Sequence, residues 1–219
     1  MADKKTFKER VKDIAIQEAV FYKEIFTENT YLIYSSNFKK KAFYILSAER
    51  DNYLHLIGVH TDLSAMEFFE KCIAQTLTED DFDFEKPYQN ENVVKGSVRR
   101  KIKCLPSLKN IFDNDDLLFE EDFKKNSIIC AIAASDEKLT LGFAHGAKSR
   151  PKTLLKGNEL SDKAIKIDLI LSKRRSDENF NKIVYGDISE INDYDNILKG
   201  YIDENLLNKL KDQKVYSHI

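Results

Sequence analysis

Two histidines stand close together in the stretch Tyr53–His60, where they flank a glycine. An imidazole titrates near neutral pH and can take up or release a proton during a reaction. We interpret this stretch as a β-strand, in which Tyr53, His55 and Ile57 share one face and two leucines share the other. His55 is therefore a candidate acid–base group, and Tyr53 and His60 are candidate binding residues. A purely structural histidine is the alternative.

A second segment, Gly142–Lys156, combines cations, hydroxyls and an imidazole in a predicted strand end and loop. Lysine and arginine bind phosphate oxygens, and hydroxyl groups donate further hydrogen bonds to them. The side chains that could do so here are His145, Lys148, Ser149, Arg150, Lys152, Thr153 and Lys156. A flexible exposed loop is the alternative, but the apolar pair Leu154–Leu155 indicates that the segment is anchored.

The charges of the chain are segregated although they nearly cancel, with 35 basic and 37 acidic residues. Six Lys/Arg residues and no acid lie within Lys95–Lys109, a segment that includes Arg99 and Arg100. Five more lie within Lys138–Asn158, and Lys173–Arg175 forms a third cluster. Such segregation can give a nearly neutral protein a basic face that suits a polyanion. An ordinary solvated surface is the alternative for each cluster.

The motifs of several enzyme classes are missing from the sequence. It contains no Walker loop, no Gly-x-Gly-x-x-Gly, no His-Glu-x-x-His and no Gly-x-Ser-x-Gly, and it has only seven glycines. Three cysteines without Cys-x-x-Cys spacing argue against a disulfide framework and a zinc site. Only Cys104 follows a run of cations of the kind that lowers a thiol pKa. We expect no metal and no cofactor.

Hydrophobic spacing predicts the helices that would help to position these groups. Capping boxes at Thr6–Glu9 and Ser64–Glu67 each precede apolar residues at three- and four-residue steps. The region Asn92–Phe119 also has helical spacing, but Pro106 interrupts it and leaves the region ambiguous. A short C-terminal helix is expected from Asp203 to Leu210.

Short runs rich in β-branched and aromatic residues predict the strands. Besides the run from Asn52 to His60, they are Thr30–Tyr34, Ala42–Leu46, Ser127–Ala134, Leu139–Ala144, Ala164–Leu171 and Lys182–Ile188. We expect Ser127–Ala134 and Leu139–Ala144 to pair as a hairpin, because a plausible tight turn separates them.

Helices that come first and antiparallel strands that come later indicate an α+β fold. We expect N-terminal helices packed on an antiparallel sheet of about four or more strands. The predicted organisation is a single domain over 1–219, with an amphipathic helix in 1–29, a core in 30–190 and a helical tail in 191–219.

The composition excludes disordered and collagen-like chains, since 42% of residues are hydrophobic and 33% are charged. The longest apolar run, Ile128–Ala134, is far shorter than the ~20 residues of a membrane helix. The N-terminal residues are charged and have no apolar signal core. We therefore expect a soluble, cytoplasmic protein that does not contact a membrane.

Several short motifs resemble those of a known family. They are His55–Gly58 (His-Leu-Ile-Gly), Ala65–Lys71 with its Phe-Phe pair, Leu141–Phe143 (Leu-Gly-Phe) and Pro151–Leu155 (Pro-Lys-Thr-Leu-Leu). Together they are similar to the phage- and prophage-associated nucleases grouped as barnase–EndoU–colicin–RelE-like, over roughly Thr30 to Asp187. The resemblance implies a helical N-terminal part, a four-stranded antiparallel sheet and a metal-independent ribonuclease, often a toxin.

Such a reaction uses the RNA 2′-hydroxyl as nucleophile and needs a general base, cations on the phosphate and a proton donor. The candidate catalytic residues are then His55, Lys148, Arg150, Lys152 and Thr153. The candidate substrate contacts are Tyr53, which could stack on a base, and His60, Arg99, Arg100, His145, Ser149 and Lys156. RNA is the implied substrate, and an antitoxin or immunity protein is an implied partner.

Three functional interpretations stay open at this point. The first is the metal-independent ribonuclease. The second is a non-catalytic module that binds nucleic acid or a partner protein through a basic face. The third is a different enzyme acting on an anionic substrate, such as an ADP-ribosyltransferase-like toxin. Dependence on a single imidazole would favour the first, and dependence on an added dinucleotide would favour the third.

Overall fold

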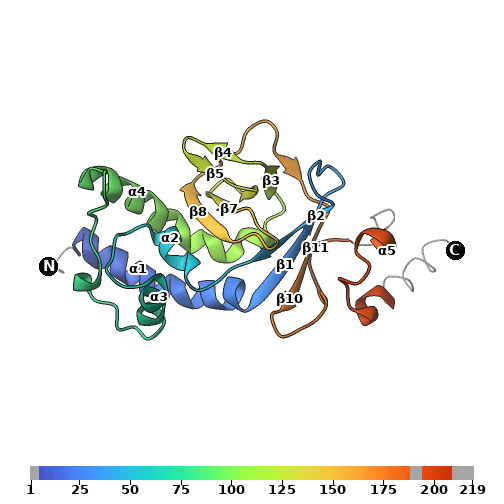
Figure 1. The fold of residues 1–219 in the computed structure, drawn as a ribbon, viewed down its shortest axis with the longest axis horizontal. Helices are drawn as coiled ribbons and strands as arrows, with labels where there is room; N and C mark the ends of the chain where they lie inside the picture. Colours follow the sequence, from blue (N-terminus) through green and yellow to red (C-terminus); the bar gives the residue numbers. More distant parts are fainter. Residues whose placement is uncertain (1–4, 188–193, 209–219) are drawn as a thin grey trace.

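Two antiparallel sheets and a group of helices surround the main hydrophobic core (Figure 1). The computed structural model describes residues 5–187 and 194–208. All pairings between the named strands of this part are antiparallel. The α+β class predicted from the order of elements is therefore confirmed.

Helices α1 to α4 gather at the end of the molecule where the N-terminus lies (Figure 1). Helix α1 (Phe7–Tyr22) and helix α3 (Ala65–Ile73) begin at the predicted capping boxes, in which Thr6 and Ser64 accept hydrogen bonds from backbone N–H groups. A π-helical turn, η1 (Lys23–Thr27), continues α1. A short 3-10 turn, η2 (Glu79–Asp81), follows α3.

The ambiguous region contains two consecutive helices of different kinds. Helix α4 (Glu91–Cys104) is α-helical, and η3 (Leu105–Asp113) is a 3-10 helix with Pro106 near its start. Proline lacks the N–H that an α-helix interior needs, but the first turn of a helix leaves that N–H unpaired anyway. The change of helix type at Leu105 thus accommodates the proline.

The first sheet has the strand order β11-β10-β1-β2. It is formed by β1 (Asn29–Tyr34), β2 (Phe43–Ser47), β10 (Leu169–Arg174) and β11 (Lys182–Gly186). Strand β1 pairs with β2 on one side and with β10 on the other. Residues from both ends of the chain therefore share one sheet.

The second sheet has the order β8-β7-β6-β3-β9. It is formed by β3 (Leu118–Glu121), β6 (Ile132–Ser135), β7 (Leu139–Phe143), β8 (Pro151–Lys156) and β9 (Ile165–Lys166). The expected hairpin is confirmed, because β6 and β7 pair in register. A small separate ribbon joins β4 (Lys124–Lys125) to β5 (Ile128–Ile129).

Strand alternation places the core on both faces of the first sheet. In β1, Tyr31 and Ile33 belong to the main core beneath the helices, whereas Leu32 and Tyr34 face a second cluster. The C-terminal part of the chain, including Leu198 next to helix α5 (Tyr194–Ile197), covers that second face. The sheet is thus buried on both sides, and it links the helical end to the C-terminal segment.

Three predictions of secondary structure are wrong, and a fourth is only partly right, because the run Ser127–Ala134 is divided between β5 and β6, which belong to different sheets. The run Asn52–His60 is not a strand, because Asn52–Ile57 forms helix α2 and Gly58 ends it. The segment Ala164–Leu171 is not one strand, since β9 and the start of β10 belong to different sheets. Residues Pro151–Lys156 are not a loop but strand β8.

The predicted C-terminal helix lies only partly within the described residues. Residues 204–208 are helical, and the rest of the predicted helix lies outside the described part. The same holds for the end of the predicted strand at Ile188 and for much of the predicted tail 191–219. Among the described residues, no helix combines the length and the apolar character needed to cross a membrane.

Candidate active site

His55 is exposed in the last turn of α2, and the end of that helix fixes its surroundings. Gly58 has φ 83, a left-handed conformation that glycine adopts readily, and it donates its N–H to Leu54 O at 2.8 Å. The Lys101 side chain of α4 crosses this turn, and its Nζ donates to His55 O at 2.5 Å. A Cβ atom at Gly58 would lie 2.9 Å from Lys101 Nζ. Glycine therefore permits both the turn and the lysine contact.

His60 is held by a carboxylate just beyond the same turn. Its Nδ1 lies 2.9 Å from Asp83 Oδ1, and the two residues also exchange backbone hydrogen bonds of 3.0 and 2.9 Å. The Asp83 carboxylate accepts a hydrogen bond from Nδ1–H, and Nε2 of the His60 ring is therefore left for a further partner. Oδ1 of Asp83 also accepts from Glu85 N, which fixes the carboxylate itself.

A single pocket of about 320 Å³ brings these groups together. Its titratable lining consists of two imidazoles and three amines: His55, His60, Lys86, Lys101 and Lys152. They come from α2 and the turn after it, from the segment before α4, from α4 and from β8. Residues far apart in the sequence thus form one concave cationic site.

The pocket has more positive charge than nearby carboxylates can balance. Among the described residues, none of Lys86, Lys101 and Lys152 forms an ion pair with Asp or Glu. Burial lowers the pKa of Lys101 to about 8, with Lys86 adding to the effect, and burial also lowers the pKa of Lys86. Such a site favours an anionic ligand, which would replace the missing counter-charge.

The same surroundings act on His55. Although the residue is exposed overall, partial desolvation of the His55 ring lowers its pKa below the ordinary value near 6.5, and the Lys101 charge lowers it further, while Asp51 acts in the opposite direction. The His55 ring is therefore mainly neutral at pH 7, in the form that accepts a proton.

Lys152 occupies a special position in β8. The pairing of β7 with β8 shifts between Gly142 and Phe143, whose partners are Thr153 and Pro151. Lys152 is thus the extra residue of a β-bulge, a feature that redirects side chains and is common beside active sites. Its Nζ donates to Ile129 O at 2.9 Å while the side chain lines the pocket.

The structure brings together three of the residues proposed from the sequence, His55, His60 and Lys152, and separates others from them. Lys148 and Arg150 are exposed outside the pocket lining, and Arg150 lies 3.9 Å from Glu49. Ser149 is buried and exchanges backbone hydrogen bonds with β2. Thr153 is also buried, with its methyl group against Gly142.

The other predicted substrate contacts also lie outside the pocket lining. Tyr53 cannot stack on a base in this structure, because it is fully buried and donates its hydroxyl to Ala15 O at 2.7 Å. The Arg99 guanidinium lies over the Phe7 ring. Arg100, His145 and Lys156 are exposed.

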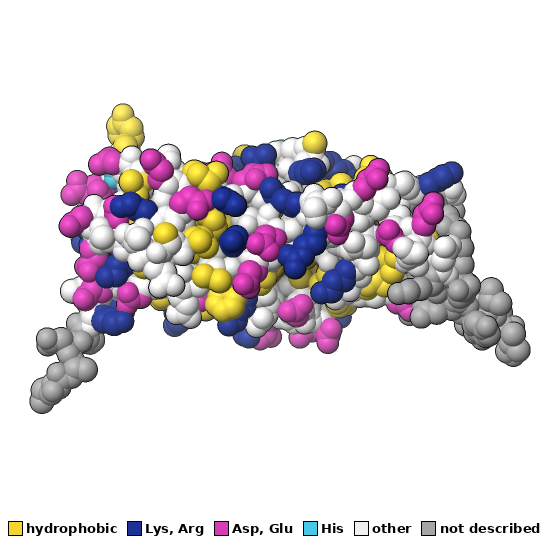
Figure 2. All heavy atoms as spheres, turned by 90° about the horizontal axis from the view of Figure 1, so that it is seen from below, with side chains coloured by type: hydrophobic (Ala, Val, Ile, Leu, Met, Phe, Trp, Pro, Cys, Tyr) yellow, Lys and Arg dark blue, Asp and Glu magenta, His cyan; other side chains and the backbone are white. Residues whose placement is uncertain are grey.

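Carboxylates lie against two arginines of the third basic cluster. Arg174 pairs with Glu28 at 3.0 Å, and Arg175 pairs with Glu49 at 2.9 Å, so the third cluster is largely neutralised. Figure 2 shows basic and acidic side chains interspersed over one face of the molecule. Lys86, Lys101 and Lys152 of the pocket have no such carboxylate partner among the described residues.

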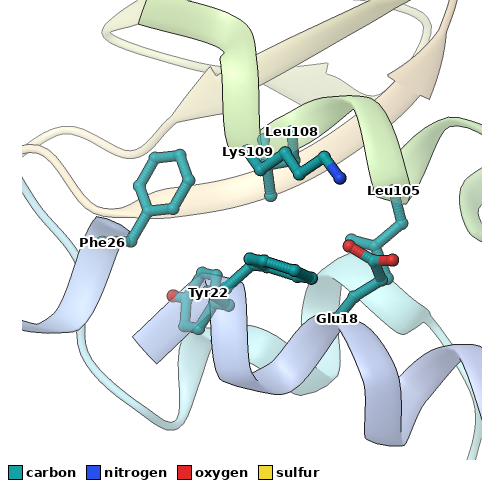
Figure 3. A pocket seen from close by; sticks show the side chains of 7 residues that line it. Glu18, Tyr22, Phe26, Leu105, Leu108 and Lys109 are labelled. Carbon is teal, nitrogen blue, oxygen red and sulfur yellow. The ribbon is translucent and has the colours of Figure 1, made fainter. Parts of the chain in front are cut away.

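The cysteines and a second pocket contribute no comparable chemistry. Cys104 is buried, and burial raises its pKa to about 11, contrary to the sequence-based expectation. The second pocket is small and mainly apolar, lined by Glu18, Tyr22 and Lys109 among others (Figure 3). Burial raises the pKa of Glu18 there, although Lys109 opposes the shift.

Sequence reasoning missed three residues of the candidate site, namely Lys86, Lys101 and Asp83. Lys101 was visible only as one of six cations in a basic segment. Its contact with Gly58, which belongs to a motif that was noticed, arises from packing of α4 on the end of α2. No signal in the local sequence marks the pairing of Asp83 with His60.

The α+β scaffold and its cationic pocket with two imidazoles are consistent with the class of nuclease-like α+β proteins. In a comparison with protein-family models, the family described as "phage-Barnase-EndoU-ColicinE5/D-RelE like nuclease4" matches residues 15–218. The chain belongs to this family, which confirms the resemblance and implies a nucleic-acid substrate. A search of curated proteins and a search of solved structures found no match.

Proposed function

We propose that the protein is a metal-independent endoribonuclease whose reaction centre is the pocket of His55 and His60. One observation carries this proposal: two imidazoles and three lysines line one pocket of a nuclease-family chain, and the three lysines form no ion pair with Asp or Glu among the described residues. Phosphate transfer to a 2′-hydroxyl needs a base, an acid and positive charge at the phosphate, and the pocket contains all three types of group.

The neighbours of the two histidines suggest which of them is the base and which is the acid. Neutral His55 takes the proton of the RNA 2′-hydroxyl as its oxygen attacks phosphorus. The bond from phosphorus to the 5′-oxygen breaks, and His60 gives that oxygen a proton, leaving a 2′,3′-cyclic phosphate and a 5′-hydroxyl. Asp83 orients the His60 ring, as the carboxylate of a catalytic triad does.

The lysines act on the phosphate. Their ammonium groups stabilise the negative charge that grows on the non-bridging oxygens as the 2′-oxygen attacks. Lys101 is the most buried of them, and Lys86 and Lys152 lie at the more accessible parts of the lining. Lys152 is thus the cation of the site that the sequence predicts, and Lys101 and Lys86 take the roles expected of Lys148, Arg150 and Thr153.

Incubation of the purified protein with RNA in EDTA tests the proposal. We expect cleavage, and we expect mapped ends to carry a 2′,3′-cyclic phosphate and a 5′-hydroxyl. A DNA of the same sequence stays intact because it lacks the nucleophile. RNA that is bound but not cut would favour the non-catalytic binding module, and cleavage only with added dinucleotide would favour the third interpretation.

A toxin role in the cytoplasm, with an antitoxin or immunity protein as partner, is a further part of the proposal. The family membership supports only the nuclease activity that such a toxin would need. Expression of the wild-type chain should then stop growth, and His55→Ala should restore it. His145→Ala is the comparison, because His145 is exposed and lines no part of the pocket.

A further inference from the structure

Tyr88 is fully exposed, and the fold does not require a tyrosine at this position. Its relative exposure is 107%, whereas Tyr201, the other strongly exposed aromatic residue of the described part, is 40% exposed and meets the Phe43 ring in an edge-to-face contact. The Tyr88 ring makes no aromatic contact, cation–π contact or hydrogen bond with the described residues. Packing therefore gives no reason for an aromatic side chain here.

The backbone at Tyr88 disfavours tyrosine. Gln89 N donates to Lys86 O at 3.1 Å and closes a β-turn, in which Pro87 is the second residue and Tyr88 the third. Tyr88 has φ 61, and turns with a positive φ at the third position usually place Gly or Asn there. A tyrosine at this point is held against its own conformational preference, as residues with binding functions sometimes are.

The turn begins at a residue of the candidate active site. Lys86 lines the pocket, and consecutive Cα atoms lie about 3.8 Å apart, so the backbones of Lys86 and Tyr88 are within about 8 Å. A strand with a phosphate at Lys86 would place a neighbouring base close to Tyr88. Aromatic rings bind single-stranded nucleic acids by stacking on bases that are not paired.

We infer that Tyr88 stacks on an unpaired base of the strand whose phosphate occupies the pocket, so that the substrate is single-stranded RNA. This inference rests on the proposed function, since it needs the phosphate site. The exposed ring beside an uncompensated cationic pocket favours nucleic acid over a protein partner. In duplex RNA the bases are already stacked, and Tyr88 would gain no contact with them.

The absence of tryptophan from the sequence permits a direct test. In Tyr88→Trp the new indole is the single tryptophan, and its fluorescence should be quenched when single-stranded 2′-O-methyl RNA stacks on it. The 2′-O-methyl groups prevent cleavage. Tyr201→Trp is the matched control, because Tyr201 packs on β2 near the C-terminal segment rather than beside the pocket. Its fluorescence should not change.

A second variant separates binding from stability. Tyr88→Asn suits the left-handed turn and should raise the melting temperature, while it weakens binding of the single strand roughly 10- to 100-fold. Tyr88→Phe should bind as the wild type does. A duplex of the same sequence should bind equally to the wild type and to Tyr88→Asn.

The outcomes distinguish this inference from the proposed function. Binding of RNA can be measured by fluorescence anisotropy. If RNA binds to Tyr88→Trp but does not quench the tryptophan fluorescence, the stacking inference is wrong and the nuclease proposal is unaffected. Equal loss of single-strand and duplex binding in Tyr88→Asn would also overturn the stacking inference. If neither form of RNA binds to the wild type, both proposals fail.

Discussion

His60 and Asp83 are joined three times, by two backbone hydrogen bonds and by the 2.9 Å contact between Nδ1 and Oδ1. Asp83→Ala keeps the backbone hydrogen bonds but removes the oxygen that accepts from both His60 Nδ1 and Glu85 N, so the His60 ring loses the group that fixes its tautomer. We expect turnover to fall about 10- to 100-fold with little change in RNA affinity, an effect typical of groups that orient a histidine. Single-turnover cleavage and anisotropy measure the two quantities. Weakened binding with unchanged turnover would contradict the positioning role.

Removal of either imidazole should affect chemistry far more than binding. His55→Ala and His60→Ala should each lower the cleavage rate about 10²- to 10⁴-fold, because general acid–base catalysis contributes mainly in the transition state. Binding of non-cleavable RNA should stay close to wild type. Cleavage by His55→Ala at the wild-type rate would support the non-catalytic module instead.

The pKa of Lys101, about 8, predicts a decline in cleavage on the alkaline side. As pH rises through this value the ammonium loses its proton, and the phosphate loses one stabilising charge. His55, whose pKa is lowered, should set the acidic limb below pH 6.5, since it must be neutral to act as base. Lys101→Arg keeps the charge at high pH and should remove the decline near 8, even if its maximal rate is lower.

Lys103 provides a control for Lys101, because it lies on the same helix, is exposed and does not line the pocket. Lys103→Arg should keep the alkaline decline of the wild type. A decline near pH 8 that persists in Lys101→Arg would assign this limb to another group.

The salt dependence of RNA binding should depend on the lysines of the pocket and not on surface cations that already pair with a carboxylate. Lys86→Gln with Lys152→Gln should reduce the slope of log K against log salt by about 0.7 for each lost phosphate contact. Arg174→Gln with Lys23→Gln should leave the slope nearly unchanged, because both cations already lie near Glu28. Titrations from low to moderate salt measure the slopes, and equal slopes for the two double variants would contradict this assignment.

The local parts of the fold could be predicted because their signals are local. A capping box specifies the start of a helix within four residues, and both predicted boxes are formed. The strand prediction for residues 52–57 is wrong because apolar residues in a run this short fit both the alternation of a strand and the spacing of a helix. In the structure the run is a helix that ends at Gly58 in a left-handed conformation, and the φ angle of a glycine cannot be read from the sequence.

The candidate site was only half predictable for a related reason. His55 and Lys152 could be assigned to one site because their side chains have complementary roles, and both do line one pocket. The roles of Lys101 and Asp83 depend on partners brought by tertiary packing, and neither the contact with Gly58 nor the pairing with His60 leaves a trace in spacing. Tyr53 has the right residue type for stacking, but its helix turns it into the core.

Glu18 predicts a pH dependence of stability that is independent of the active site (Figure 3). Its pKa is raised in the folded state, so folding favours the protonated form, and this stabilisation is lost as pH rises from the ordinary value through the raised one. Glu18→Gln should therefore stabilise the protein at pH 7.5, on the order of 1 kcal/mol, and have little effect near pH 4.

Thermal unfolding at the two pH values measures this effect. Glu24→Gln, which removes an exposed carboxylate from the continuation of the same helix, should change the melting temperature little at either pH. An equal gain at pH 4 and pH 7.5 for Glu18→Gln would show that the charge of Glu18 is not its cause.

The pairing of β1 with β10 has a consequence for the order in which a ribosome makes this protein. Arg174 binds Glu28 across 146 residues of sequence, and β1 has β10 as its second neighbour in the sheet. Until the codons for β10 have been translated and that segment has left the exit tunnel, one edge of β1 lacks its partner. The helical end and the second sheet can emerge first, but the first sheet closes only late in synthesis. A nascent chain paused before residue 169 should therefore still be sensitive to protease around β1.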